Sequence, residues 1–303
     1  MHDPDSWTIT FAGGRLDRAV HLRNDEALTR LRHAPQARTL LVGEGQSVAV
    51  DGPQTLLRAP LPSGDGAHLA LLGVQDGAPL FVADATNANA GGADLEFVGL
   101  REAAAGLTAQ EAALAGYAVA LVAWQRTHRF CGRCGTATVS EQAGHRRRCP
   151  ACGLRTFPRT DPVVTMVIES GDRALLTRRR GAVGATWSAV AGFIEPGETP
   201  EEALVREAQE EVGVTVRAVH YVGAQPWPFP HVLMLGYRAL ADPDLTAATV
   251  RDTEELAGAR WFTRAELRAE LDAGTIALPP AIAIGHRLIV DWLERGGEQR
   301  PQD

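Results

Sequence analysis

Short apolar runs, separated by glycine, proline and aspartate, fill the first 107 residues of the chain. The runs lie at residues 39–42, 67–74 and 80–82. Runs of this length between turn-forming residues are typical of strands, and the pattern predicts a small α+β domain without evident chemistry. A capping box, Thr-Ala-Gln-Glu at residues 108–111, then predicts a helix that reaches about Thr127.

A second series of elements lies in the C-terminal half. Thr-Pro-Glu-Glu at residues 199–202 is another capping box with proline at the first helical position, and Gly213 is a natural helix stop. Residues 216–223 and 232–240 have the pattern of strands. An amphipathic pattern at residues 280–293 predicts a last helix, with an apolar stripe formed by Ala281, Gly285, Leu288, Ile289 and Trp292.

The composition agrees with a soluble protein of two domains. The 303 residues are 45% hydrophobic and 22% charged, which allows substantial cores. No segment approaches the length and apolarity of a membrane helix. The net charge of -7 argues against nonspecific nucleic-acid binding by the whole surface, although arginines cluster at residues 146–148 and 178–180. We therefore expect a cytoplasmic protein that does not bind membranes.

Four cysteines form two C-x-x-C pairs with fourteen residues between them. They are Cys131, Cys134, Cys149 and Cys152, and the chain contains no other cysteine. Four thiolates at this spacing can fill the tetrahedral sphere of one structural Zn²⁺ per chain and leave no position for water. The alternatives are two disulfides or a redox dithiol, and the absence of any sign of an oxidising compartment favours a four-cysteine zinc ribbon.

Three carboxylates fall on one face of the helix that follows residue 199. Glu207, Glu210 and Glu211 have the spacing i, i+3 and i+4. Like charges packed in this way cost stability unless a cation compensates them, and oxygen-only ligands suit Mg²⁺ or Mn²⁺. A solvated acidic helix face is the alternative and the commoner origin of a charge run. The fixed upstream Gly192 and the preceding Arg206 favour a metal site, because a solvated face requires neither.

The complete pattern of residues 192–214 is G-x5-E-x7-R-E-U-x-E-E-x-G-U, where U is usually bulky and aliphatic. It resembles the Nudix box of the Nudix hydrolases, and only Ala208 is small for its U position. The resemblance implies a Nudix α/β/α sandwich that hydrolyses a diphosphate with bound divalent metal. In such enzymes the helix glutamates hold the metal, and the residues matched by Glu198 and Arg206 orient the loop and the helix. The catalytic residues implied are Glu198, Arg206, Glu207, Glu210 and Glu211.

Residues 225–230, Gln-Pro-Trp-Pro-Phe-Pro, resemble the S-Q-P-W-P-F-P-x-S array of the NADH pyrophosphatase subgroup. Alternating prolines stiffen the backbone and would hold two aromatic rings in set directions for a flat ligand. The alternative is a stiff loop that packs both rings into the core. Substrate contacts are expected from Gln225, Trp227 and Phe229. Ala224 and Val232 stand where the subgroup pattern has serines, which leaves the fine substrate preference open.

Further site residues follow from positions matched to the subgroup. The resemblance implies that the rings of Phe157 and Phe193 stack on the nicotinamide. It also implies that the metal binds the backbone carbonyl of Ala191 and one acidic residue further along the chain. That residue is expected to be Glu255, with Glu254 as the alternative because the preceding loop differs in length.

The resemblance covers about residues 124–293. We expect an N-terminal α+β domain with a linking helix at 1–125, the ribbon at 126–158 and a Nudix domain at 159–303. The implied reaction is hydrolysis of NADH or NAD⁺ to nicotinamide mononucleotide and AMP, and removal of NAD caps from RNA 5′ ends would break the same bond. Alternatives are hydrolysis of ADP-ribose or another nucleoside diphosphate derivative, and a non-catalytic nucleotide sensor. A homodimer is also implied.

Overall fold

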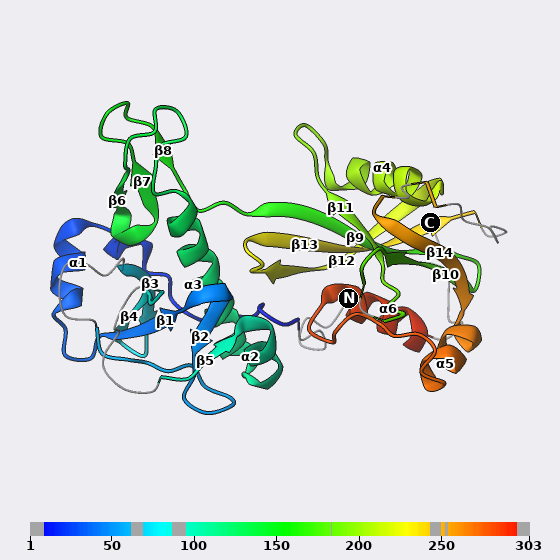
Figure 1. Ribbon diagram of the computed structural model, residues 1–303, viewed down its shortest axis with the longest axis horizontal. Helices are drawn as coiled ribbons and strands as arrows, with labels where there is room; N and C mark the ends of the chain where they lie inside the picture. The colour runs from blue at the N-terminus through cyan, green and yellow to red at the C-terminus, as the bar shows by residue number, and fades with distance from the viewer. Residues whose placement is uncertain are drawn as a thin grey trace. The chain divides into compact units, whose positions relative to one another are not determined.

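The computed structural model describes residues 9–61, 69–86, 95–182, 184–242, 250–251 and 254–295 (Figure 1). The chain forms two compact units, which we call the N-terminal unit and the Nudix unit. The N-terminal unit comprises Met1–Thr160 and Pro226–Val232, and the Nudix unit comprises Asp161–Gln225 and Leu233–Asp303. No helix among the described residues is long and apolar enough to cross a membrane.

A five-stranded sheet in the order β3-β4-β1-β2-β5 forms the base of the N-terminal unit. Strands β1 and β4 are parallel, and the other neighbours are antiparallel. The strands are β1 (Arg38–Val42), β2 (Ser47–Ala49), β3 (Leu69–Gln75), β4 (Ala78–Asp84) and β5 (Phe97–Gly99). The short helices are η1 (Val20–Leu22), α1 (Asp25–Arg32), η2 (Glu44–Gln46) and α2 (Leu100–Gly106). This mixed sheet with helices confirms the expected α+β class.

Helix α3 (Ala109–Thr127) confirms the helix predicted from its N-terminal capping residue. The hydroxyl of Thr108 accepts a hydrogen bond from the backbone N–H of Glu111 at 3.3 Å. The Glu111 carboxylate turns away from the helix and accepts hydrogen bonds from Arg58 and from the backbone N–H of Leu56. The half of the predicted capping box that depends on Thr108 therefore forms. The Glu111 carboxylate, which would make the other half, binds Arg58 and Leu56 instead. The side chain of Trp124 is fully buried in the core that α3 covers.

The ribbon is a small three-stranded sheet in the order β6-β7-β8. Its elements are β6 (Val139–Glu141), η3 (Gln142–Gly144), β7 (Arg146–Arg148) and β8 (Arg155–Thr156). The arginines of β7 bind residues of the ribbon itself: Arg146 and Arg148 pair with Glu141, and Arg147 donates to Thr138. The basic cluster in this part of the sequence is therefore partly neutralised within the fold.

The Nudix unit contains a sheet in the order β12-β13-β9-β10-β14, with β11 also paired to β9. The strands are β9 (Asp161–Ser170), β10 (Arg173–Arg179), β11 (Val190–Phe193), β12 (Val216–Trp227), β13 (Val232–Ala241) and β14 (Leu256–Thr263). The helices are α4 (Pro200–Val212), α5 (Arg264–Asp272) and α6 (Ile284–Glu294). Helices α4 and α6 lie on opposite faces of this sheet (Figure 1), which is the expected α/β/α arrangement.

Helix α6 begins four residues later than its sequence pattern predicts. Residues 280–283 form a turn in which the backbone N–H of Ala283 donates to the carbonyl of Pro280 at 2.9 Å. Ala281 is therefore exposed and leaves the predicted stripe. Gly285, Leu288, Ile289 and Trp292 are buried as expected.

Candidate active site

Helix α4 carries the box glutamates, and local contacts set both of its ends. The hydroxyl of Thr199 accepts from the N–H of Glu202 at 3.2 Å, and the Glu202 carboxylate accepts from the N–H of Thr199 at 2.7 Å. Gly213 ends the helix with φ 67°, a left-handed conformation that glycine adopts at little cost. The residues that dock the helix are Ala203, Leu204, Ala208 and Val212. Ala208, the one small residue of the box pattern, is fully buried.

Arg206 gathers the polar groups of the box around one guanidinium. It donates to both oxygens of Glu198 at 2.7 and 2.9 Å, to Glu207 at 2.7 Å and to Glu210 at 3.0 Å. It also donates to the backbone carbonyl of Phe193 at 2.8 Å, which joins the helix to the end of β11. Hydrogen bonds from Arg206, and then from a backbone amide, lower the pKa of Glu198 to about 2. Arg206 thus holds loop and helix in one arrangement.

The Glu207 carboxylate lies directly against the backbone of β11. A Cβ atom built on Gly192 would lie 1.9 Å from its carboxylate carbon, so only glycine allows this approach. Burial raises the pKa of Glu207, Arg206 opposes the rise, and the charges of Glu210 and Glu255 add to it. These carboxylates therefore lie close enough to repel one another.

The three helix glutamates differ in exposure. The side chain of Glu207 is 13% exposed and that of Glu210 is 59% exposed, whereas Glu211 as a whole is 4% exposed. Burial of a carboxylate as deep as Glu211 is costly without compensation. A solvated acidic face predicts that all three of these carboxylates are exposed, and of the three only Glu210 is.

Arg179 contacts both Ala191 and Glu255. In the sequence it stood out only as part of the arginine cluster at residues 178–180. Arg179, at the end of β10, donates to the Ala191 carbonyl at 3.1 Å and lies 3.5 Å from the Glu255 carboxylate. The backbone carbonyl of Glu255 also accepts a hydrogen bond from the backbone N–H of Arg180 at 2.7 Å. Glu254 precedes it in the same turn.

The two candidate stacking rings are both exposed. Phe193 ends β11 in the Nudix unit and is 58% exposed. Phe157 follows β8 in the N-terminal unit and is 55% exposed. Large aromatic rings are usually buried, so rings left open in this way are available to stack on a ligand.

The proline-aromatic array is held by contacts within the protein, and those of Gln225 were not expected from the sequence. Gln225 is 1% exposed, and its amide donates to the carbonyl of Ile282 and accepts from the N–H of Ile284, both at 2.7 Å. These bonds fix the turn before α6 and occupy both ends of the amide. Trp227 and Phe229 are half-buried and pack against the core of the N-terminal unit. The structure therefore places these three side chains in contacts within the protein.

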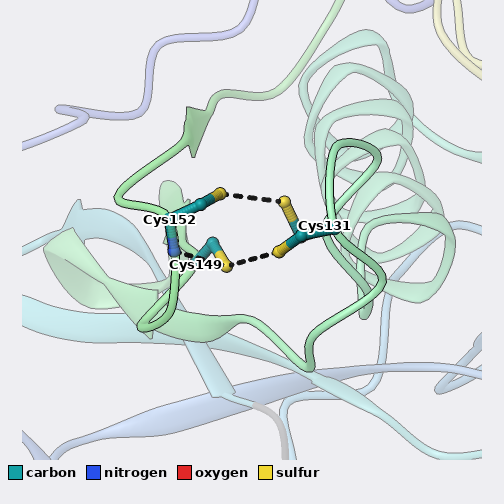
Figure 2. Close-up of side chains that lie close together, drawn as sticks. Cys131, Cys149 and Cys152 are labelled. Carbon is teal, nitrogen blue, oxygen red and sulfur yellow. Dashed lines mark hydrogen bonds between the residues drawn. The ribbon is translucent and has the colours of Figure 1, made fainter.

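The four cysteine sulfurs lie within 4.8 Å of one another, and Figure 2 shows three of them turned toward a common centre. The Sγ atoms of Cys131 and Cys152 are 3.6 Å apart, and those of Cys134 and Cys149 are 3.5 Å apart. Disulfide sulfurs lie about 2 Å apart, whereas Zn–S bonds of 2.3 Å place tetrahedral sulfurs roughly 3.8 Å apart. Backbone amides also point at Cys131 and Cys149. The geometry fits a structural zinc site.

Three family descriptions match the chain in succession. An NADH pyrophosphatase-like rudimentary NUDIX domain matches residues 17–124, an NADH pyrophosphatase zinc ribbon domain matches 126–157, and a NUDIX domain matches 158–283. A solved NUDIX hydrolase from Nitrosomonas europaea is 22% identical and covers 55% of this chain and 92% of its own, with a TM-score of 0.41.

Relatives that are named for an activity align over much of the chain. A protein from Deinococcus radiodurans, "NAD-capped RNA hydrolase NudC", is 39% identical over 268 residues, which are 86% of this chain and 89% of that protein. A protein of the same name from Mycobacterium bovis is 42% identical over 188 residues, 59% of each chain. The human "NAD-capped RNA hydrolase NUDT12" is 40% identical over 62% of this chain and 43% of its own.

Proposed function

This chain belongs to the Nudix hydrolases that carry the NADH pyrophosphatase zinc ribbon, and we propose that it hydrolyses the diphosphate bond of NAD(H) to nicotinamide mononucleotide and AMP. The observation that carries the proposal is the intact box, folded so that Arg206, Glu207 and the backbone at Gly192 lie together. A non-catalytic sensor would need none of these contacts to be preserved.

The donor set fits a divalent metal. The Glu207 carboxylate lies against β11 where no Cβ could fit. Burial raises the pKa of Glu207, Arg206 opposes the rise, and the charges of Glu210 and Glu255 add to it. Carboxylates that repel one another beside a backbone carbonyl are the oxygen ligands that Mg²⁺ and Mn²⁺ prefer. The residues that would hold the ions are Ala191, Glu207, Glu210, Glu211 and Glu255. Glu255 is preferred to Glu254 because its charge acts on Glu207.

The bound ions would neutralise the diphosphate oxygens and lower the pKa of the attacking water. The chain itself positions the groups. Arg206 holds Glu207 and Glu210 in place, and its double hydrogen bond to Glu198 fixes the loop before α4. Phe193 and Phe157 would stack on the nicotinamide with their exposed rings.

Removal of NAD caps from RNA is proposed as a second activity of the same site. It is supported by the relatives from Deinococcus radiodurans and human, which are both named NAD-capped RNA hydrolases. The bond broken is the same, and only the leaving fragment is larger. Rates of hydrolysis of NADH and of an NAD-capped RNA, measured at equal concentrations of enzyme and metal, would compare the two substrates directly.

The test of the reaction is chromatography of products from NADH, NAD⁺ and ADP-ribose with Mg²⁺ or Mn²⁺. Reduced nicotinamide mononucleotide and AMP are expected from NADH, and chelation of the metal should abolish them. Cleavage of ADP-ribose without cleavage of NADH would replace the proposed substrate. We also propose that the protein is cytoplasmic and that it forms a homodimer. Light scattering of the purified protein would test the dimer by its molar mass.

Replacement of Arg206 by lysine is expected to lower kcat about ten- to a hundredfold, the usual loss when a partner of metal ligands is removed. An ammonium has only three N–H donors and cannot replace the five hydrogen bonds that the guanidinium makes to Glu198, Glu207, Glu210 and the Phe193 carbonyl. Steady-state kinetics at saturating metal would measure the change. Arg217→Lys, at an exposed arginine of the same unit, is the control. Unchanged kcat in Arg206→Lys would contradict the assignment.

Substitution of Gly192 by alanine is expected to weaken Mn²⁺ binding about tenfold. The added Cβ would overlap the Glu207 carboxylate and push it out of place. Titration with Mn²⁺, followed by electron paramagnetic resonance, measures the Mn²⁺ affinity in the absence of substrate. Gly99→Ala is the matched control, because a Cβ at Gly99 would meet no atom within 4 Å. Equal Mn²⁺ affinity in both variants would argue against Glu207 as a ligand.

A further inference from the structure

Two aromatic residues of the proline-aromatic array lie in a defined pair within the N-terminal unit. The ring centroids of Trp227 and Phe229 are 4.9 Å apart and their planes meet at 65°. The edge-to-face pair is favourable in itself. Neither ring is fully buried, although both pack against the core of this unit. Side chains outside the array therefore also contact the two rings and can restrain which way they face.

Phe11 supports the pair from the core side. Its ring lies edge to face with Trp227 at 6.2 Å and with Phe229 at 5.9 Å, and Phe11 is 3% exposed. Gly116 of α3 lies beside this contact. A Cβ there would lie 3.1 Å from Phe11 Cδ1 and 3.2 Å from Pro228 Cγ, so the helix, Phe11 and the segment fit together closely. Phe11 thus fixes the inner side of the pair.

Arg101 covers the pair from the solvent side. Its guanidinium carbon lies 3.9 Å from the centroid of Phe229 and 5.0 Å from that of Trp227. Arg101 itself is exposed. A planar guanidinium stacked on two rings restricts how their planes can rotate, whereas an exposed cation–π contact adds little to overall stability. This arrangement suits the control of ring orientation better than the filling of a core.

We propose that Arg101 and Phe11 are positioning residues that set the orientation of Trp227 and Phe229 for substrate binding. The inference rests on the proposed function, because it assumes that the array contributes to recognition of the dinucleotide. It assigns the N-terminal unit a purpose that its sequence did not reveal. The role is one in binding, so the effect is expected to fall on KM and to leave kcat nearly unchanged.

The structural half of the proposal is tested without activity. The chain has six tryptophans, and biosynthetic 5-fluorotryptophan gives each a ¹⁹F resonance, with Trp227→Phe identifying the signal of Trp227. Arg101→Ala and Phe11→Leu are expected to shift or broaden that resonance, and Arg101→Lys to shift it less. Arg217→Ala, at an exposed arginine paired with Asp242, should leave it unchanged. An unmoved Trp227 resonance in both Arg101→Ala and Phe11→Leu would overturn the proposal.

The kinetic half uses the same variants. Arg101→Ala is expected to raise KM for NADH roughly two- to fivefold, the factor that an exposed cation–π contact supplies, with kcat within twofold of wild type. A shifted resonance with unchanged KM would show that the rings serve packing alone and would also overturn the proposal. If the wild type cleaves ADP-ribose and not NADH, the proposed substrate fails, and the KM comparison on ADP-ribose still decides the role of Arg101.

Discussion

Glu211→Gln is expected to lower kcat for NADH by at least about a hundredfold, because the change removes one charge from the proposed metal ligands while the shape of the side chain is kept. Glu211 lies in the last turn of α4 and is 4% exposed. A neutral amide cannot compensate a divalent cation as a carboxylate does, so the affinity for Mn²⁺ should fall together with kcat. Steady-state kinetics and Mn²⁺ titration measure the two effects separately.

Glu201→Gln is the matched control for this substitution. Glu201 lies on the same helix and is exposed in its first turn, away from the box residues of the last turns. Its replacement changes the net charge equally and should leave kcat within about twofold of wild type. Near-normal kcat with full metal dependence in Glu211→Gln would remove Glu211 from the catalytic set.

The elements that sequence predicts well here are those whose causes are local. Both ends of α4 depend on Thr199 and Gly213, which lie next to the helix that they cap. The two C-x-x-C pairs likewise fix which sulfurs converge. The family resemblance adds positions that spacing alone cannot supply, such as Ala191 and Glu255, and their ligand roles stay predictions.

The contacts that sequence missed join residues far apart in the chain. Phe11 meets Phe229, and Gln225 binds the turn at Ile282, without any periodic pattern that would connect them. Strand β12 also continues through Pro226 to Trp227, beyond its predicted end. Proline usually argues against a strand, but β12 is an edge strand, where a missing N–H need not cost a ladder hydrogen bond.

Removal of the ribbon zinc is expected to unfold the ribbon. Cys149 is fully buried, its sulfur lies 3.5 Å from that of Cys134, and the backbone N–H of Cys152 points at it at 3.4 Å. Cys149→Ser should therefore reduce zinc from one ion per chain to nearly none, as measured by elemental analysis. Binding of structural zinc supplies on the order of 10 kcal/mol in small domains, which a three-stranded sheet this short cannot replace.

Loss of the zinc in Cys149→Ser is expected to unfold the ribbon while the Nudix unit stays folded. Amides of β6, β7 and β8 should lose protection from hydrogen exchange, and the first melting transition should fall by more than about 10 °C, while β9 and α4 keep their protection because their core contains no ribbon residue. Ser140→Ala, at an exposed position of β6, is the control and should change neither zinc content nor melting. A zinc-free Cys149→Ser protein with wild-type protection of β7 would show that hydrogen bonds, and not the metal, hold the ribbon together.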